Sequence, residues 1–338
     1  MSVTIKDIAL ALGISPSTVS RALNGHPDIS EETRKSVKDV AKKMNYHVNQ
    51  MASSLRTKKS FSIGVVVPKI ASYFFSSALS GIQEVAVSNN YQVLICQTNE
   101  SPTLEKKYIS SLLSAKVDGL LISLAKGSKN IKHIQRVIEH NVPLVLFDRT
   151  SDSFKVHKIE AEDFKGAHRA VTHLIDTGCK RIVHLSGPDT LAASLNRMRG
   201  YKEALKDKGL EVDDELIVPC DFDPETGRKA IKRLLDKYPD IDGIFTVNDE
   251  LGVESILTLK SMGIKVPDRV SVVGFGDFPI CRIVDPQLSS VSHHPEKIGY
   301  EAAKCLLDQM KNKQKENNTR RVVPSELVIR ASSSKKLS

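Results

Sequence analysis

The sequence predicts two kinds of structure in one chain: an N-terminal all-α module and a larger α/β domain with two lobes. Helical patterns and an excess of basic residues both occur within residues 1–60. From residue 61 onward, short β-branched runs alternate with helical stretches, which is typical of parallel sheets covered by helices. The length of 338 residues accommodates one small module and one large domain.

The first helix is predicted from a capping pattern and an apolar stripe. Thr4 with Asp7 three residues later is a typical helix start. The apolar residues that follow recur at helical spacing, namely Ile5, Ile8, Ala9 and Leu12. Gly13 can adopt the left-handed conformation that ends this helix, and Ser15 can cap a second helix beginning at Pro16. This arrangement predicts a helix-turn-helix.

A third helix is predicted after Ser30, which can cap it. Glu31 and Glu32 favour the positive end of a helix. A second buried stripe follows in Val37, Val40, Ala41 and Met44. The three helices together predict one compact module.

The second helix has the pattern of a DNA-recognition helix, whose start enters the major groove. Pro16, Ser17, Ser20 and Arg21 are then exposed, whereas Val19, Ala22 and Leu23 face inward. Arg21 can donate two hydrogen bonds to guanine or contact a phosphate. A three-helix bundle with some other use is the alternative.

The distribution of charge favours a nucleic-acid partner. The chain carries a net charge of +9, and residues 1–60 contain ten Lys/Arg against five acidic residues. More than half of the excess therefore lies in the predicted module, which is where phosphate contacts are expected.

Residues 4–25 read T-I-K-D-I-A-x-x-x-G-I-S-x-S-T-V-S-R-A-L-N-G, which closely resembles the signature of the lactose-repressor/galactose-repressor family of bacterial regulators. The resemblance continues through I-S-E-E-T-R at residues 29–34 and N-Y-x-x-N-x-x-A-x-S-L-R at residues 45–56. It implies a cytoplasmic homodimer that binds operator DNA. The residues expected to contact DNA are Thr4, Ser15, Pro16, Ser17, Thr18, Ser20, Arg21, Asn24, Asn49, Ala52, Ser53 and Leu55.

Residues 48–60 are expected to form a hinge between the module, residues 1–47, and the domain, residues 61–335. This segment lacks a core-sized apolar face. The resemblance implies a hinge helix that orders on the operator, with Leu55 inserted into the minor groove. The alternative is that Leu55 docks on the neighbouring domain. Val48 stands where the family usually has proline.

The larger domain is predicted to contain two parallel, doubly wound sheets. Strands are expected at residues 63–67, 91–96, 119–123, 142–147, 181–185, 216–219, 243–247 and 270–275, and helices at 78–88, 104–115 and 168–177. Because ligands of such sheets bind beyond the carboxyl ends of the strands, the cleft between the lobes is the expected binding site.

The resemblance extends to E-L-V-I-R at residues 326–330 and implies a domain like a periplasmic sugar-binding protein, with a small-molecule effector, expected to be a carbohydrate, between the lobes. Eleven residues are carried over as effector contacts: Ser72, Tyr73, Phe74, Asp148, Arg149, Asp163, Arg197, Phe222, Asn248, Asp249 and Asp277. For several of these residues the alternative is a purely structural role. Asp148 and Asp249 could cap helices, the phenylalanines could be core, and Arg197 could form only an ion pair.

The sequence departs from the family pattern in the cleft. Gly276 and Asp277 stand where the family usually has two aspartates, so the first carboxylate is missing. Ser72 and Tyr73 replace asparagine and proline. The identity of the effector therefore cannot be taken from another family member, and neither can the direction of its effect.

Three other functional classes fit the sequence less well. An enzyme is disfavoured because the phosphate-loop, nucleophile-elbow and metalloprotease motifs are missing from the sequence. A secreted binding protein is disfavoured by the helix-turn-helix and by the lack of a signal peptide before Thr4. A purely architectural DNA-bending protein leaves the cleft unexplained. The five scattered cysteines give no metal-site spacing, and no cofactor, metal or membrane partner is expected.

Overall fold

The computed structural model describes residues 3–23, 25–46, 59–128, 132–311 and 319–334. The chain divides into two compact units, Met1–Ser60 and Phe61–Ser338. The larger unit contains two lobes, each built around one sheet.

Three helices form the N-terminal unit: α1 (Ile5–Leu12), α2 (Pro16–Leu23) and α3 (Glu31–Lys43). Their shared core consists of Ile8, Ala9, Val19, Ala22, Val37 and Ala41. Gly13 ends α1 in the left-handed conformation with φ of 64°. Ser30 caps α3, since its Oγ accepts a hydrogen bond from the backbone N–H of Thr33 at 3.2 Å. The predicted helix-turn-helix and third helix are confirmed.

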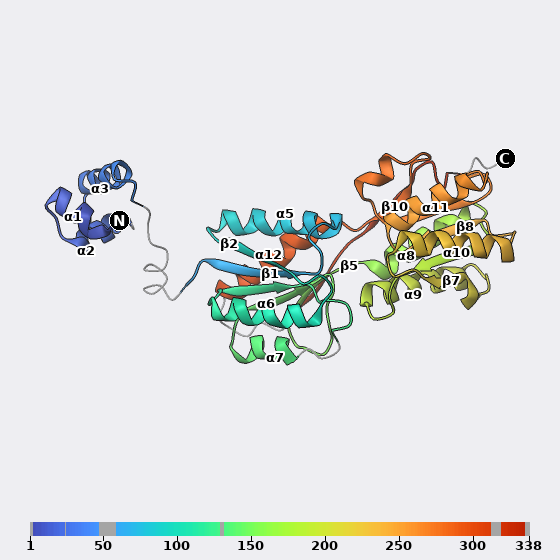
Figure 1. Cartoon of the computed structure of the whole chain (residues 1–338), viewed down its shortest axis with the longest axis horizontal. Helices are drawn as coiled ribbons and strands as arrows, with labels where there is room; N and C mark the ends of the chain where they lie inside the picture. Colours follow the sequence, from blue (N-terminus) through green and yellow to red (C-terminus); the bar gives the residue numbers. More distant parts are fainter. Residues whose placement is uncertain (1–2, 24, 47–58, 129–131, 312–318, 335–338) are drawn as a thin grey trace. The chain divides into compact units, whose positions relative to one another are not determined.

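The first lobe contains a six-stranded, fully parallel sheet in the order β11-β5-β4-β3-β1-β2. Its strands are β1 (Ser62–Val67), β2 (Gln92–Gln97), β3 (Gly119–Ile122), β4 (Leu144–Phe147), β5 (His157–Ala161) and β11 (Arg320–Val323). Helices α5 (Tyr73–Ser88) and α12 (Pro295–Lys311) cover one face, and α6 (Pro102–Ser114) and α7 (Lys132–Glu139) cover the other (Figure 1).

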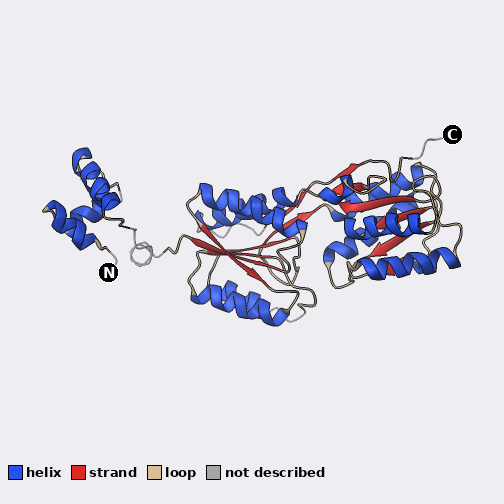
Figure 2. Ribbon diagram, turned by 45° about the horizontal axis from the view of Figure 1, so that its top comes forward, coloured by secondary structure: helices blue, strands red, loops and turns tan. Residues whose placement is uncertain are grey.

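The second lobe contains a sheet in the order β12-β10-β9-β8-β6-β7. Its strands are β6 (Ile182–Ser186), β7 (Ile217–Pro219), β8 (Gly243–Thr246), β9 (Ser271–Gly276), β10 (Ser289–Ser292) and β12 (Glu326–Val328). Only β12 runs antiparallel to its neighbour among the described strand pairs. Figure 2 shows helices on both sides of the strands: α8 (Asp163–Asp176) and α9 (Ala192–Asp207), and α10 (Pro224–Lys237) and α11 (Asp249–Ser261).

The chain passes between the lobes three times, after β5, after β10 and after β11. The prediction of two lobes with parallel, doubly wound sheets is confirmed. The predicted starts of two helices were wrong, since α5 begins at Tyr73 rather than residue 78 and α8 at Asp163 rather than residue 168. In α5 the extra turn is held because Phe74 and Phe75 are buried in the core of the first lobe.

Candidate functional site

The start of α2 is fixed by a cluster of three hydroxyl groups. Ser15 Oγ accepts a hydrogen bond from the backbone N–H of Thr18 at 3.1 Å, which caps the helix. The hydroxyls of Ser17 and Thr18 lie 2.7 Å and 2.8 Å from the same oxygen. This arrangement presents a rigid polar helix end on the surface of the module.

The two faces of α2 differ as a recognition helix requires. Val19 and Ala22 are fully buried, whereas Pro16, Ser17 and Arg21 are exposed. Ser20 is half-buried. The remaining predicted contacts of this region, Asn24, Asn49, Ala52, Ser53 and Leu55, lie outside the described residues.

Thr4 forms the predicted capping box with Asp7. The backbone N–H and the hydroxyl of Thr4 donate to Asp7 Oδ2 at 2.8 Å and 2.7 Å. These hydrogen bonds lower the pKa of the Asp7 carboxyl. The structure therefore assigns Thr4 a local role in starting α1, beside any contact to DNA.

The loops at the carboxyl ends of the strands contain an unusual number of left-handed residues. Asn99 and Glu100 follow β2, Asp148 follows β4, and Asp221 and Phe222 follow β7, all with φ between 50° and 61°. Side chains with a Cβ seldom adopt this conformation, and such residues tend to occur at functional sites. These loops are therefore candidates for a functional site at the carboxyl ends of both sheets.

Asp148 and Arg149 lie at the end of β4, where the sequence predicted an effector site. Burial raises the pKa of Asp148 to about 6, an effect that the nearby Arg149 and Arg197 partly oppose. Ser123 Oγ donates to Asp148 at 3.4 Å, a long hydrogen bond that leaves the carboxylate under-satisfied. Arg149 is held by Glu100, to which its Nη1 donates at 2.7 Å and 2.8 Å.

Arg197 is buried and already well occupied. Its Nε donates to Asp163 Oδ1 at 2.8 Å, and its Nη1 donates to the carbonyl of Val247 at 2.6 Å. Its guanidinium carbon lies 3.8 Å from the centre of the Phe275 ring. Burial raises the pKa of Asp163, while the charge of Arg197 opposes the rise. Asp163 and Arg197 therefore form a buried ion pair between α8 and α9 in the second lobe.

Asn248 and Asp249 serve the start of α11. Asn248 Oδ1 accepts from the backbone N–H of Leu251 at 3.2 Å and so caps the helix. Asp249 is fully buried, and its oxygens accept from the Phe278 backbone N–H at 2.8 Å and from Ser290 Oγ at 2.5 Å. Burial raises the pKa of Asp249 to about 6. Both oxygens of Asp249 are thus engaged within the second lobe.

The predicted aromatic contacts lie against protein cores. Phe74 is buried and stacks on His293, with ring centres 5.1 Å apart. Ser72 precedes α5, and its backbone carbonyl accepts from Ser76 at 2.9 Å. Phe222 is partly buried against the core of the second lobe.

One pocket lies between the lobes beside Arg149. It has a volume of about 210 Å³ and is lined from the first lobe by residues 124–128, except Lys126, and 149–151. Thr190, Leu191 and Ala192, at the start of α9, line it from the second lobe. Of the eleven predicted effector contacts, only Arg149 lines this pocket directly.

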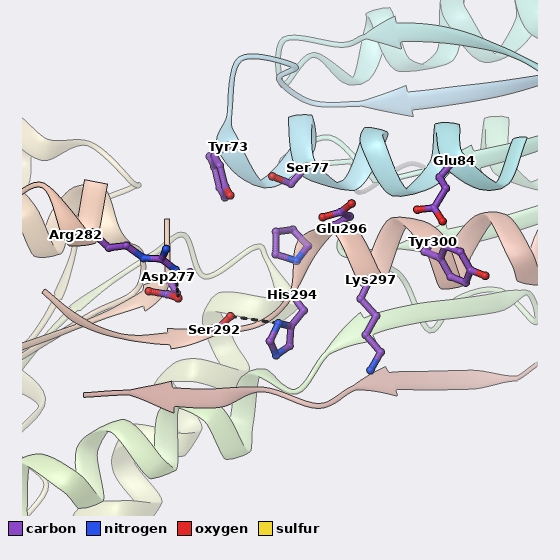
Figure 3. A pocket seen from close by; sticks show the side chains of 12 residues that line it. Tyr73, Ser77, Glu84, Asp277, Arg282, Ser292, His294, Glu296, Lys297 and Tyr300 are labelled. Carbon is purple, nitrogen blue, oxygen red and sulfur yellow. Dashed lines mark hydrogen bonds and ion pairs between the residues drawn. The ribbon is translucent and has the colours of Figure 1, made fainter. Parts of the chain in front are cut away.

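A larger pocket of about 550 Å³ lies where α5 and α12 meet the second lobe. Figure 3 shows Tyr73, Ser77 and Glu84 along α5, and Asp277 and Arg282 on the facing second lobe. Tyr73 and Asp277 therefore belong to a different pocket from Arg149. Asp277 is held 2.6 Å from Arg330 by an ion pair.

Three residues of the cleft were not predicted from the sequence, namely Lys126, Ser194 and Asp221. Lys126 follows β3 and forms an ion pair with Asp221, which follows β7 in the other lobe. Ser194 lies in the first turn of α9, and its hydroxyl is buried. The rule that ligands bind beyond the carboxyl ends of strands would have pointed to the loops that carry Lys126 and Asp221.

Two features are absent from the described residues. Among the helices of residues 3–23, 25–46, 59–128 and 132–311, none is long and apolar enough to cross a membrane. The described part of the chain also contains no group of three or more His, Cys, Asp or Glu side chains that could hold a metal ion.

Comparisons with known proteins cover nearly the whole chain. It is 30% identical over 335 residues to the HTH-type transcriptional regulator DegA of Bacillus subtilis, spanning 99% of each protein. It is 31% identical over 330 residues to the HTH-type transcriptional repressor CytR of Escherichia coli, spanning 97% of this chain and 96% of CytR.

The fold is shared with solved structures. A structure described as the transcriptional regulator CelR–cellobiose complex superposes with a TM-score of 0.75 and 27% identity, covering 98% of this chain and 99% of that one. Residues 4–49 match the family of bacterial regulatory proteins named lacI, and residues 60–331 match the periplasmic binding proteins and sugar-binding domain of that family. The chain therefore belongs to the LacI family of transcriptional regulators.

Proposed function

We propose that this regulator reads operator DNA as a cytoplasmic homodimer, and that a small hydroxylated molecule bound between its lobes sets its DNA affinity. The observation that carries the DNA-reading part is the capped start of α2, with Ser17 and Arg21 exposed and Val19 and Ala22 buried. The cytoplasmic location is proposed because the DNA target, a bacterial operator, lies in the cytoplasm.

The α2 surface suits recognition in the major groove. An exposed arginine on a fixed helix can donate two hydrogen bonds to a guanine edge. The hydroxyls of Ser15, Ser17 and Thr18 can contact phosphates or bases at the same helix end. Two such modules in a dimer would read two half-sites related by two-fold symmetry.

A carbohydrate or related polyol is the proposed effector class. The carboxylate of Asp148 and the guanidinium of Arg149 lie side by side at the cleft, and together they supply acceptors and donors for neighbouring hydroxyls. A relative of known structure, CelR, is described in complex with cellobiose. Phe222, Asp163, Arg197, Asn248 and Asp249 are proposed to shape the cleft rather than to contact the ligand with free polar atoms.

Effector binding and DNA binding are proposed to be coupled through lobe geometry. A ligand that binds one lobe arrangement more tightly shifts the population toward it. That arrangement would determine whether the two hinge segments, residues 48–60, can pair on DNA with Leu55 in the minor groove. The same coupling can serve release from DNA or capture on it.

We further propose that the chain has no enzymatic activity. The full-length relatives are regulators. The buried ionisable groups of the cleft also have structural partners, since Arg197 pairs with Asp163 and Asp249 is bonded to Ser290.

The test is selection of bound duplexes from a randomised DNA pool by the purified full-length protein, with and without a panel of sugars and nucleobases. Enrichment of a near-palindromic site with a pyrimidine–purine step at its centre would support the operator-reading dimer. A compound that changes the recovery of that site identifies the effector and the direction of its effect. Failure to enrich any sequence under any condition would overturn the proposal.

A further inference from the structure

A second pocket opens beside the one at Arg149, between helix α9 and the edge strand β7. Its volume is about 350 Å³, and most of its surface is apolar. The apolar part comes from Pro188, Leu195, Met198, Ile217 and Pro219, and Lys126 reaches it from the first lobe. Asp189 and Asp221 stand among its polar residues.

Two observations indicate that this pocket has an occupant. Ser194 lines it, and the Ser194 hydroxyl is buried and has no hydrogen-bond partner among the described residues. A buried hydroxyl without a partner is costly and calls for an explanation. Leu195, also in the lining, leaves 37% of its surface exposed, whereas the other large apolar side chains of α9 are buried or half-buried. An apolar ligand with one hydroxyl would satisfy both residues.

Gly187 explains how the pocket stays open beside Ser194. A Cβ at this position would lie 2.4 Å from Ser194 Oγ and 3.0 Å from the Phe222 ring. Because glycine has no Cβ, the loop after β6 can pass close to both side chains, and the Ser194 hydroxyl keeps its place in the lining.

We infer that this pocket takes a neutral aromatic or branched aliphatic group, and that the effector of this regulator is therefore amphipathic. The inference rests on the proposed function, because it extends the proposed effector site. Thr190 lines both pockets, so one molecule can place its hydroxylated part beside Arg149 and its apolar part between α9 and β7.

Charge and size define the class of group. An anionic group is disfavoured because the carboxylates of Asp189 and Asp221 line the pocket and the ammonium of Lys126 is already paired with Asp221. A cavity of about 150 Å³ lined by apolar side chains is enough to hold benzene. The pocket is larger than this, so one substituted ring fits.

The experiment uses the full-length protein and benzyl alcohol, a ring with one hydroxyl, observed by saturation-transfer NMR at about 10 mM. Glycerol is the polar comparison probe. Leu195→Glu places a carboxylate in the pocket, and Leu257→Glu makes the same change at an exposed position of α11 that does not line it. Circular dichroism verifies that both variants fold.

We expect benzyl alcohol to bind the wild-type protein, to bind Leu195→Glu at least tenfold more weakly, and to bind Leu257→Glu with unchanged affinity. Ser194→Ala should remove any preference for benzyl alcohol over toluene. Absence of saturation transfer to the wild-type protein, or equal binding by Leu195→Glu, would overturn the inference.

The same samples separate this inference from the proposed function. If a sugar changes operator recovery for the wild-type protein while benzyl alcohol fails to bind, the apolar part of the site is wrong and the regulator proposal stands. If benzyl alcohol binds as expected while no DNA sequence is enriched, the pocket is real and the proposed function has failed.

Discussion

The ammonium group of Lys126 contacts the carboxylate of Asp221 and so joins the two lobes across the cleft. The backbone N–H of Lys126 also donates to Glu100 Oε2 at 2.8 Å, and Glu100 in turn holds Arg149. An interaction between residues that are 95 positions apart therefore extends into the predicted effector site. A ligand that binds beside Arg149 must therefore either break these contacts or add to them.

The first prediction concerns the strength of that pair. Lys126 and Asp221 are 35% and 59% exposed, so solvent screens their attraction. We expect Lys126→Met and Asp221→Asn to couple by about 0.2 to 1 kcal/mol in a double-mutant cycle of urea unfolding, and the coupling to vanish in high salt. A coupling of zero at low salt would show that the pair does not hold the lobes together.

The second prediction concerns DNA recognition by α2. We expect Arg21→Ala to weaken binding to the selected operator by about 1 to 3 kcal/mol and binding to random DNA far less, because a base contact carries sequence information. Effector affinity should not change. Fluorescence anisotropy measures both DNAs, and Lys35→Ala, an exposed charge on α3, is the control. Equal losses on both DNAs would identify Arg21 as a phosphate contact.

The third prediction concerns Leu55 in the hinge. Insertion of a leucine side chain into a base step costs a few kcal/mol of unstacking, which is offset by contacts on the bent duplex. Leu55→Ala should therefore lose operator affinity and DNA bending together, as measured by energy transfer between dyes at the duplex ends. Leu10→Ala, at a leucine that is 86% exposed on α1, controls for loss of a surface leucine. Bending that survives in Leu55→Ala would refute the wedge.

Local signals predicted the DNA-reading module well. The Thr4–Asp7 capping box and the caps at Ser15 and Ser30 are interactions between near neighbours, so the sequence itself contains both partners. The burial of Val19 and Val37 follows in the same way from helical spacing. Short-range geometry decides these features.

The cleft was harder to predict because its geometry depends on contacts between distant segments. The family resemblance grouped Tyr73 and Asp277 with Arg149 as effector contacts, yet both line the pocket between α5, α12 and the second lobe. Asp277 is held there by Arg330, which the last crossing of the chain brings back. Ser194 was missed because its hydroxyl is buried without a hydrogen-bond partner among the described residues, which only a folded structure reveals.

The fourth prediction concerns the pH dependence contributed by Asp148. Burial raises its pKa in the folded state to about 6, above the ordinary value of 3.8. The folded protein therefore binds this proton more tightly, and the stability it provides is present below pH 4 and is lost as the pH rises toward 6. At pH 7 the ionised Asp148 carboxylate therefore destabilises the fold. This is expected of a residue whose role is to bind a ligand.

We expect Asp148→Asn to be more stable than the wild type at pH 7 by roughly 1 to 3 kcal/mol, since each pKa unit corresponds to about 1.4 kcal/mol. The difference should grow between pH 4 and pH 6 and then level off, as followed by urea unfolding. Glu203→Gln, at an exposed position of α9, serves as the control. A variant that is less stable at pH 7, or a difference independent of pH, would contradict this account.

The last prediction concerns Gly276, which stands where the family usually has an aspartate. Its φ of 140° is rarely adopted by residues with a side chain. A Cβ would lie 2.7 Å from both Asp249 Oδ2 and the Phe278 ring. Gly276→Asp should therefore cost at least about 2 kcal/mol of stability, because it combines backbone strain, steric overlap and a second carboxylate beside Asp249.

Gly276→Ala separates these causes, since it keeps the strain and the overlap but adds no charge. We expect Gly276→Ala to lose most of the same stability, and Gly276→Asp to recover part of its deficit as Asp249 and the new carboxyl are protonated at low pH. Thermal unfolding between pH 4.5 and pH 8 measures both effects. If Gly276→Asp instead matched the wild type in stability and bound sugars more tightly, the missing carboxylate would be a simple vacancy in the cleft. The expected loss of stability means that Phe278 and Asp249 leave no room for a side chain at position 276. Recognition of ligand hydroxyls then depends on Asp148.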